Sequence, residues 1–157
     1  MNQDHLIDTA RRLVQPSAEA AQEFESRRET LAEELNRQMA VRPDLDKLIG
    51  PDNLAMMQDN SRNLCRFMST IFRGHEPVVL VNTVLWVFRA YRSHGFRTTY
   101  WAANLDTLVE ILRQRLTPAA FQSVYPFFDW LIVNIPLFVQ ISDSQLHEAL
   151  SETPQHG

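Results

Sequence analysis

Cysteine, glycine and long hydrophobic runs are scarce in this sequence of 157 residues. It contains one cysteine, Cys65, and four glycines. A single cysteine excludes an internal disulfide and a zinc site built from cysteines, and it fits a reducing, cytoplasmic location. The longest apolar stretches, 78–88 and 131–139, contain polar or proline residues and fall short of the ~18 apolar residues of a membrane span. We therefore expect one domain, 1–157, with no membrane association.

The charge balance and the motifs point away from nucleic acids and from catalysis. The formal net charge is −4, which disfavours binding to nucleic acid through net charge. The sequence has no glycine-rich phosphate loop, no nucleophile elbow and no His-Glu-x-x-His motif. None of the five histidines is spaced from another as a metal pair on one helix. We expect no enzyme activity, no catalytic residues and no metal site.

Helical signals run through the whole chain, whereas no alternating strand pattern with an Asn-Gly or Asp-Gly turn occurs. The three internal glycines each follow a helical pattern, as glycine does at a helix end. We expect Ser17, Asp52 and Thr117 to cap helices, and Pro126 to bend one. The fold class predicted is all-α, with helices over 5–15, 17–40, 53–73, 77–94, 99–116 and 117–135 and a last short helix from Ser142.

The first predicted helix carries a narrow apolar stripe that needs a partner surface. A helix this short is marginal in water unless the stripe is buried. The next helix is highly charged and offers little apolar area, so we expect a homodimer with contributions from the first helix; burial within the same chain stays open as the alternative. The stripe consists of Leu6, Ile7, Ala10, Leu13 and Val14.

The predicted helix over 53–73 carries the main candidate for a binding site. Asp59, Arg62 and Arg66 lie at i, i+3 and i+7 and share one face. Such a group is often a surface ion pair. If it faces a cavity, it suits a ligand that has both N–H donors and carboxylates, and a linear tetrapyrrole has pyrrole N–H groups and propionates.

Aromatic residues and one histidine in the second half leave further alternatives open. Trp86 and Tyr91 are candidates for a ligand pocket, although core packing explains most aromatics in a helical protein. His94 precedes the glycine that ends its helix. It therefore suits a helix C-cap better than a metal or haem ligand.

The order of these motifs resembles the globin-like superfamily, and its phycobiliprotein branch in particular. The resemblance spans about 53–111 and rests on Met56, Asp59, Phe72-Arg73-Gly74 and Val79-Leu80. In that family a cysteine holds the chromophore, and an aspartate three residues later accepts hydrogen bonds from its pyrrole nitrogens. The resemblance assigns the aspartate's role to Asp59. Met56 stands where the chromophore cysteine would be, so it implies no covalent bond.

Two kinds of relative follow from the resemblance. One is the haem-less globins associated with bilin biosynthesis. The other is the globin-like input domains of stressosome sensors, which the runs from Tyr91 to Trp101 and from Val124 to Trp130 resemble. Both imply a globin-like core, 52–151, after an N-terminal helical extension, 1–40, and both are dimeric or associate through such elements.

The resulting hypothesis is a non-enzymatic protein that binds a bilin, such as biliverdin or a phycobilin, without a covalent bond and without haem. Its partners would be a second copy of the chain and enzymes of bilin biosynthesis. The alternative is a signalling or interaction domain with no ligand. A haem globin, with His94 or His75 as the axial ligand, is a third hypothesis. The predicted ligand-binding residues are Met56, Asp59, Arg62, Arg66, Trp86 and Tyr91.

Overall fold

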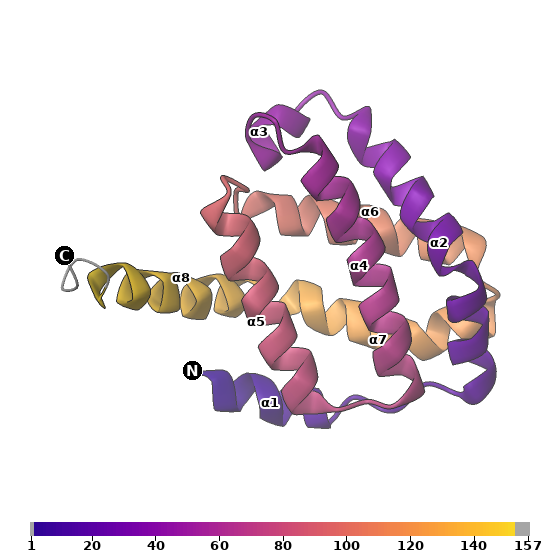
Figure 1. Cartoon of the computed structure of the whole chain (residues 1–157). Coiled ribbons are helices and arrows are strands. Elements are labelled where there is room, and N and C mark those ends of the chain that lie inside the picture. The colour runs from indigo at the N-terminus through magenta and orange to yellow at the C-terminus, as the bar shows by residue number, and fades with distance from the viewer. Residues whose placement is uncertain (1, 153–157) are drawn as a thin grey trace.

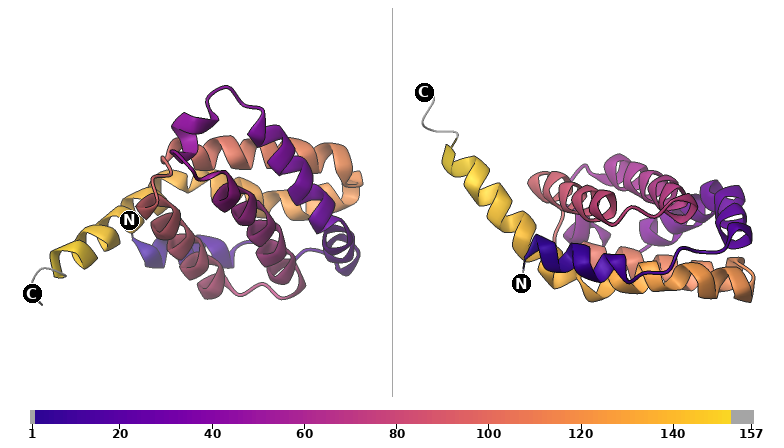
Figure 2. Two further views of the ribbon diagram at one scale, coloured as in Figure 1. Left: turned by 45° about the horizontal axis from the view of Figure 1, so that its top comes forward. Right: turned by 90° about the horizontal axis from the view of Figure 1, so that it is seen from below.

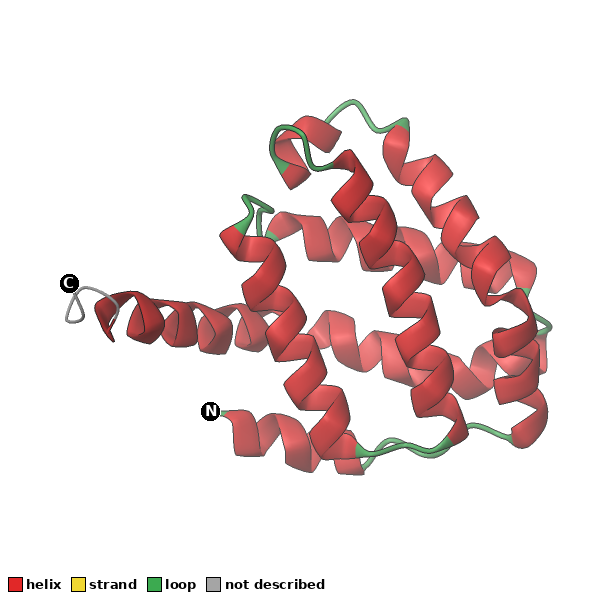
Figure 3. Ribbon diagram, viewed as in Figure 1, coloured by secondary structure: helices red, strands yellow, loops and turns green. Residues whose placement is uncertain are grey.

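Helices form all the regular secondary structure of the computed structural model, which describes residues 2–152 (Figure 3). No strand occurs in this part of the chain, so the all-α prediction is confirmed. The described helices are α1 (Gln3–Arg11), α2 (Ala18–Ala40), α3 (Leu45–Ile49), α4 (Leu54–Arg73), α5 (Pro77–Ser93), α6 (Thr99–Arg115), α7 (Pro118–Val133) and α8 (Ile135–Glu152).

The helices are arranged in two crossing layers (Figures 1 and 2). In Figure 1, α2, α4 and α5 lie in front of α6 and α7, and α8 continues away from the body of the molecule. α2 packs along α4 and also against α6 and α7, whereas α5 packs against α1 and α8. α4 and α5 are therefore each held mainly by other helices rather than by one another.

Four phenylalanines form the centre of contact between the layers. Phe24 of α2 meets Phe72 of α4 edge to face, with ring centroids 4.9 Å apart. Phe72 in turn contacts Phe127 of α7 at 5.3 Å and Phe128 at 5.9 Å. Edge-to-face pairs add to the free energy gained by burying the rings. One connected hydrophobic core includes this centre and runs from Leu6 to Phe138.

Two predicted caps form as expected, and one of them has a partner that the sequence did not reveal. The hydroxyl oxygens of Ser17 and Thr117 accept hydrogen bonds from the backbone N–H groups of Ala20 and Ala120. The Glu23 carboxylate of α2 accepts two further bonds from Thr117, one from its N–H at 2.7 Å and one from its hydroxyl at 2.8 Å. A carboxylate at a helix N-terminus is also favoured by the helix dipole.

Two glycines and an asparagine join the turn before α4 to the turn after α5. Gly50 and Gly95 have φ values of 79° and 100°, a backbone conformation that favours glycine. A Cβ atom on Gly50 would lie 3.2 Å from the carbonyl oxygen of Gly95. The Asn53 amide donates to the carbonyl oxygens of Ile49 at 2.6 Å and His94 at 2.8 Å. These contacts fix the start of α4 beside the end of α5.

Two predicted helix boundaries and one predicted cap were wrong. The first helix ends at Arg11 and not at Gln15, and the Gln15 side chain accepts a hydrogen bond from the His75 N–H at 2.7 Å. Asp52 does not cap α4: its φ is 61°, and Asn53 occupies the N-cap position without a side-chain cap bond.

The last helix begins at Ile135 and not at Ser142, directly after Asn134 ends α7. α7 and α8 meet at a bend of 53°. Pro126 lies inside α7. The bend lies further along the chain, at the junction between α7 and α8 that precedes Pro136. Within residues 2–152 no single helix is long and apolar enough to cross a membrane, and α7 and α8 reach that length and composition only as a bent pair.

The apolar stripe of α1 is covered by its own chain. Leu6 and Ala10 are fully buried in the core, and Trp130 of α7 donates through its indole N–H to the Thr9 hydroxyl at 2.9 Å. Val14, beyond the helix end, is 80% exposed. The argument that α1 needs a partner copy is therefore wrong, and the homodimer stays a prediction without that support.

Phe72→Ala tests the importance of the aromatic centre. We expect it to lower the free energy of unfolding by about 3–5 kcal/mol, because it removes a buried ring and leaves a cavity. Urea unfolding followed by circular dichroism gives this difference. Val79→Ala is the control, since Val79 is partly exposed on α5 and should cost far less. Equal losses in the two variants would contradict this account of the core.

Candidate ligand-binding site

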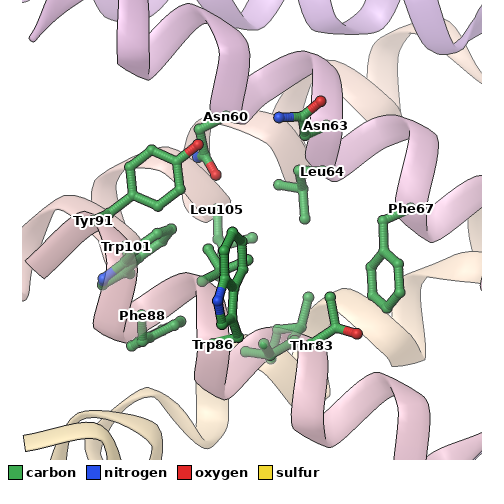
Figure 4. A pocket seen from close by; sticks show the side chains of 13 residues that line it. Asn60, Asn63, Leu64, Phe67, Thr83, Trp86, Phe88, Tyr91, Trp101 and Leu105 are labelled. Carbon is green, nitrogen blue, oxygen red and sulfur yellow. The ribbon is translucent and has the colours of Figure 1, made fainter. Parts of the chain in front are cut away.

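A pocket of about 230 Å³ lies between α4 and α5 (Figure 4). Four of its residues come from α4 and six from α5, and α6 and α7 close its inner side. The pocket lies midway along these two helices, which pack mainly on other helices and little on each other. It is lined by Asn60, Asn63, Leu64, Phe67, Thr83, Val84, Trp86, Val87, Phe88, Tyr91, Trp101, Leu105 and Leu131.

Aromatic rings form one wall of the pocket. Phe88 stacks on Trp101 with ring centroids 4.4 Å apart and an interplanar angle of 14°. Tyr91 meets the same indole edge to face at 5.9 Å. Trp86 is different, because 59% of the residue is exposed while it also lines the pocket. Its indole therefore stands at the mouth, between the tyrosine side and Phe67 (Figure 4).

A small hydrogen-bond network forms the polar inner end. Asn60 of α4 donates through Nδ2 to the hydroxyl of Tyr100 at 2.9 Å, and Asn104 donates to the same hydroxyl at 3.1 Å. All three residues are buried, and the Asn104 Oδ1 atom has no hydrogen-bond partner. Burial raises the pKa of Tyr100 well above its usual value, although the bond from Asn60 opposes this effect. The Tyr100 hydroxyl therefore stays neutral and accepts a hydrogen bond from each of the two amides.

Tyr91 and Asn63 of α4 line the polar part of the pocket, and the charge of Asp59, which does not line it, acts on Tyr91. Burial raises the pKa of Tyr91, the nearby Asp59 carboxylate raises it further, and a hydrogen bond from the Asn63 side chain acts in the opposite direction. Tyr91 is therefore also a neutral hydroxyl at ordinary pH. Asp59 itself is exposed and forms an ion pair with Arg62, with 2.5 Å between Nη2 and Oδ1.

The structure brings two of the six predicted site residues together in the pocket, namely Trp86 and Tyr91. Met56 is half-buried at the start of α4 and does not line it. Arg62 and Arg66 line a different groove, against Arg28 of α2. At 100° per residue along a helix, these arginines lie well away from the pocket-facing positions of α4.

The arginines nevertheless reach back toward the pocket side of α4. Arg62 contacts Asp59, and Nη1 of Arg66 donates to Oδ1 of Asn63 at 3.3 Å. Asn63 itself lines the pocket. The two guanidinium groups therefore contact residues next to the pocket but do not line it.

The one cysteine lies away from the pocket and is chemically quiet. Cys65 is buried, and burial raises the pKa of its thiol to about 12, with only a small opposing effect from Arg28. Only the thiolate is a good nucleophile. Cys65 therefore offers no site for attaching a chromophore through sulfur.

The two histidines considered as haem ligands have other contacts. His94 caps α5, with its Nδ1 atom 2.8 Å from the carbonyl oxygen of Ala90. His75 lies between α4 and α5, with Nε2 2.8 Å from the carbonyl oxygen of Ala10. Neither lines the pocket. Within residues 2–152, no three His, Cys, Asp or Glu side chains are grouped so that they could hold a metal ion.

The residue that sequence analysis missed is Asn60. Its signal was present in the spacing of Asn60, Leu64 and Phe67, which repeat at the interval of one helical face. A polar residue on an apolar face indicates a buried hydrogen bond or a binding group. The charged residues at 59, 62 and 66 indicate a different face of the same helix.

No protein-family model, curated protein or solved structure matches the chain.

The reactivity of the Cys65 thiol tests whether this side chain is buried in the folded protein. With a pKa of about 12 instead of 9.0, the thiolate fraction at pH 8 falls about a thousandfold, so Ellman's reagent should react only on unfolding. The raised pKa also means that the neutral Cys65 thiol favours the folded state below pH 9. This stabilisation is lost as the pH rises from 9 to 12. Cys65→Ser is the control, and rapid native reaction at pH 8 would contradict the prediction.

Proposed function

We propose that the chain is a non-enzymatic helical binding protein that holds a flat, largely apolar ligand non-covalently between α4 and α5, and that the ligand is a linear tetrapyrrole. The observation that carries this proposal is the pocket itself, which has stacked aromatic walls, an amide at its inner end and no charged lining side chain. Small-molecule sites commonly combine apolar walls with a few placed polar groups.

The size of the pocket determines how such a ligand would bind. At about 230 Å³, the pocket is smaller than the roughly 300–1,000 Å³ of sites that enclose a drug-sized molecule. A tetrapyrrole would therefore insert one end and extend past Trp86 at the mouth. Outside, Asp59 would accept a hydrogen bond from a pyrrole N–H, and Arg62 or Arg66 would approach the propionates.

The exposed Trp86 also supports the alternative function, a ligand-free interaction domain. Trp86, Val78 and Val79 are large apolar residues of α5 that are all substantially exposed. A ligand-free interaction domain would use this part of α5 to contact another protein. A globin-like arrangement of 52–151, a homodimer and association with enzymes of bilin biosynthesis belong to the first proposal, and they rest on the resemblance of 53–111.

A titration with biliverdin tests the binding proposal. We expect a shift in the bilin absorption spectrum and quenching of tryptophan fluorescence, with no comparable change for haemin. Leu64→Trp should abolish the shift by filling the pocket, whereas Val133→Trp adds the same side chain at an exposed site and should leave it unchanged. Acid-urea should release the pigment from the chain.

Three other outcomes of the pigment titration would lead to different conclusions. An unchanged spectrum with both pigments would favour the ligand-free interaction domain. A shift with haemin alone would favour a haem protein. Bilin binding that survives Leu64→Trp would reject the α4–α5 pocket as its site.

Asp59→Asn tests the proposed rim contact. Because Asp59 is exposed, its interaction with a ligand N–H is screened, and we expect a loss of about 0.2–1 kcal/mol, at most roughly fivefold in affinity. The loss should shrink in high salt. Asp106→Asn on α6 is the control. No difference between the two variants at low salt would remove Asp59 from the site.

A further inference from the structure

The buried hydrogen bonds determine which atom Asn60 presents to the pocket. Asn60 is only 3% exposed, and its amide nitrogen is used in the bond to the Tyr100 hydroxyl. Asn104 donates to the same hydroxyl, so two amide donors occupy both lone pairs of that oxygen. With its nitrogen held in this way, the Asn60 side chain points its oxygen into the pocket (Figure 4). The pocket therefore has a fixed hydrogen-bond acceptor at its inner end.

The remaining walls restrict what can bind to that acceptor. No charged side chain lines the pocket, so a carboxylate at the inner end would be buried without a cation. A hydrocarbon would fill the space but would leave the Asn60 oxygen desolvated and unpaired. A neutral aromatic ring with an N–H donor meets both requirements, because its apolar surface would contact the aromatic and aliphatic walls and its N–H would pair with the amide oxygen.

We infer that Asn60 makes the pocket selective for a neutral aromatic ring that carries an N–H group, of the pyrrole or indole class, and that this ring is the inserted end of the ligand. The inference rests on the proposed function, since it assigns the chemistry of the same pocket. The size agrees, because an apolar cavity of about 150 Å³ already takes up benzene. Tyr100 and Asn104 are positioning residues that hold the amide.

Two small ligands of the same shape test this selectivity on the wild-type chain. Indole has the N–H group, and benzothiophene replaces it with sulfur. Isothermal titration calorimetry should show that indole binds about five- to a hundredfold more tightly, as expected when a buried acceptor would otherwise lose its partner. Equal affinities would overturn the inference. Tighter binding of quinoline, which accepts but does not donate, would also overturn it, because the amide would then present its nitrogen.

A pair of variants assigns the preference to Asn60. Asn60→Leu should make the affinities for indole and benzothiophene equal. Asn63→Leu is the matched control, because it makes the same change at another amide that lines the pocket, and it should keep the preference. Circular dichroism confirms folding, and if Asn60→Leu does not fold, the comparison on the wild-type chain decides alone. A preference that persists in folded Asn60→Leu overturns the assignment.

Failure of this inference is distinguishable from failure of the proposed function. If neither small ring binds, the inference is overturned, while the biliverdin titration still decides whether the chain binds a tetrapyrrole. If indole is preferred and biliverdin does not bind, the selectivity stands and the tetrapyrrole proposal is rejected.

Discussion

The edge-to-face contact of Phe24 with Phe72 fixes α4 against α2, and the position of the pocket depends on this contact. α4 buries its main apolar face on α2, and its second apolar face, which carries Leu64 and Phe67, lies toward α5 without packing closely on it. α5 instead finds its partners in α1 and α8. The space between α4 and α5 is therefore a consequence of where each helix packs best, and aromatic side chains from α5 and α6 occupy its wall.

Contacts at both ends of α4 and α5 keep that space from closing or spreading. At one end, Asn53 joins the start of α4 to the carbonyl oxygen of His94, next to the close approach of Gly50 and Gly95. At the other end, hydrogen bonds of His75 join the connecting segment to Ala10 of α1 and to Gln15, which follows α1. Two helices held at both ends define a pocket whose walls are largely formed in advance. Such preorganisation lowers the entropic cost of binding.

The sequence predicts the helices and several of their ends, because caps and stops are local. Ser17 and Thr117 bind backbone groups three residues away, and no tertiary contact is needed to recognise them. The last helix begins earlier than predicted, with Pro136 in its first turn. A proline in the first turn of a helix lacks only an N–H that would be unpaired there in any case.

The site was harder to predict, because α4 has two apolar faces. Met57, Met68 and Phe72 belong to the buried core, while Leu64 and Phe67 face the pocket. Periodicity alone does not say which face meets which helix, and so it does not say whether Asp59 and Arg62 point into a cavity or toward solvent. The tertiary packing of α2 decides this, and it leaves the ion pair exposed to solvent and places Asn60 inside.

The buried amides themselves argue against a purely structural reading of the pocket. A core position is most simply filled by an apolar side chain, and each buried polar group must recover its lost hydration through hydrogen bonds. Here Asn60, Tyr100 and Asn104 recover it only in part, since the Asn104 oxygen has no partner and the Asn60 oxygen faces the pocket. Local departures of this kind are typical of functional sites, where stability is lost in exchange for specificity. A ligand that donates to Asn60 would supply the partner that this oxygen lacks, from the side on which the pocket lies.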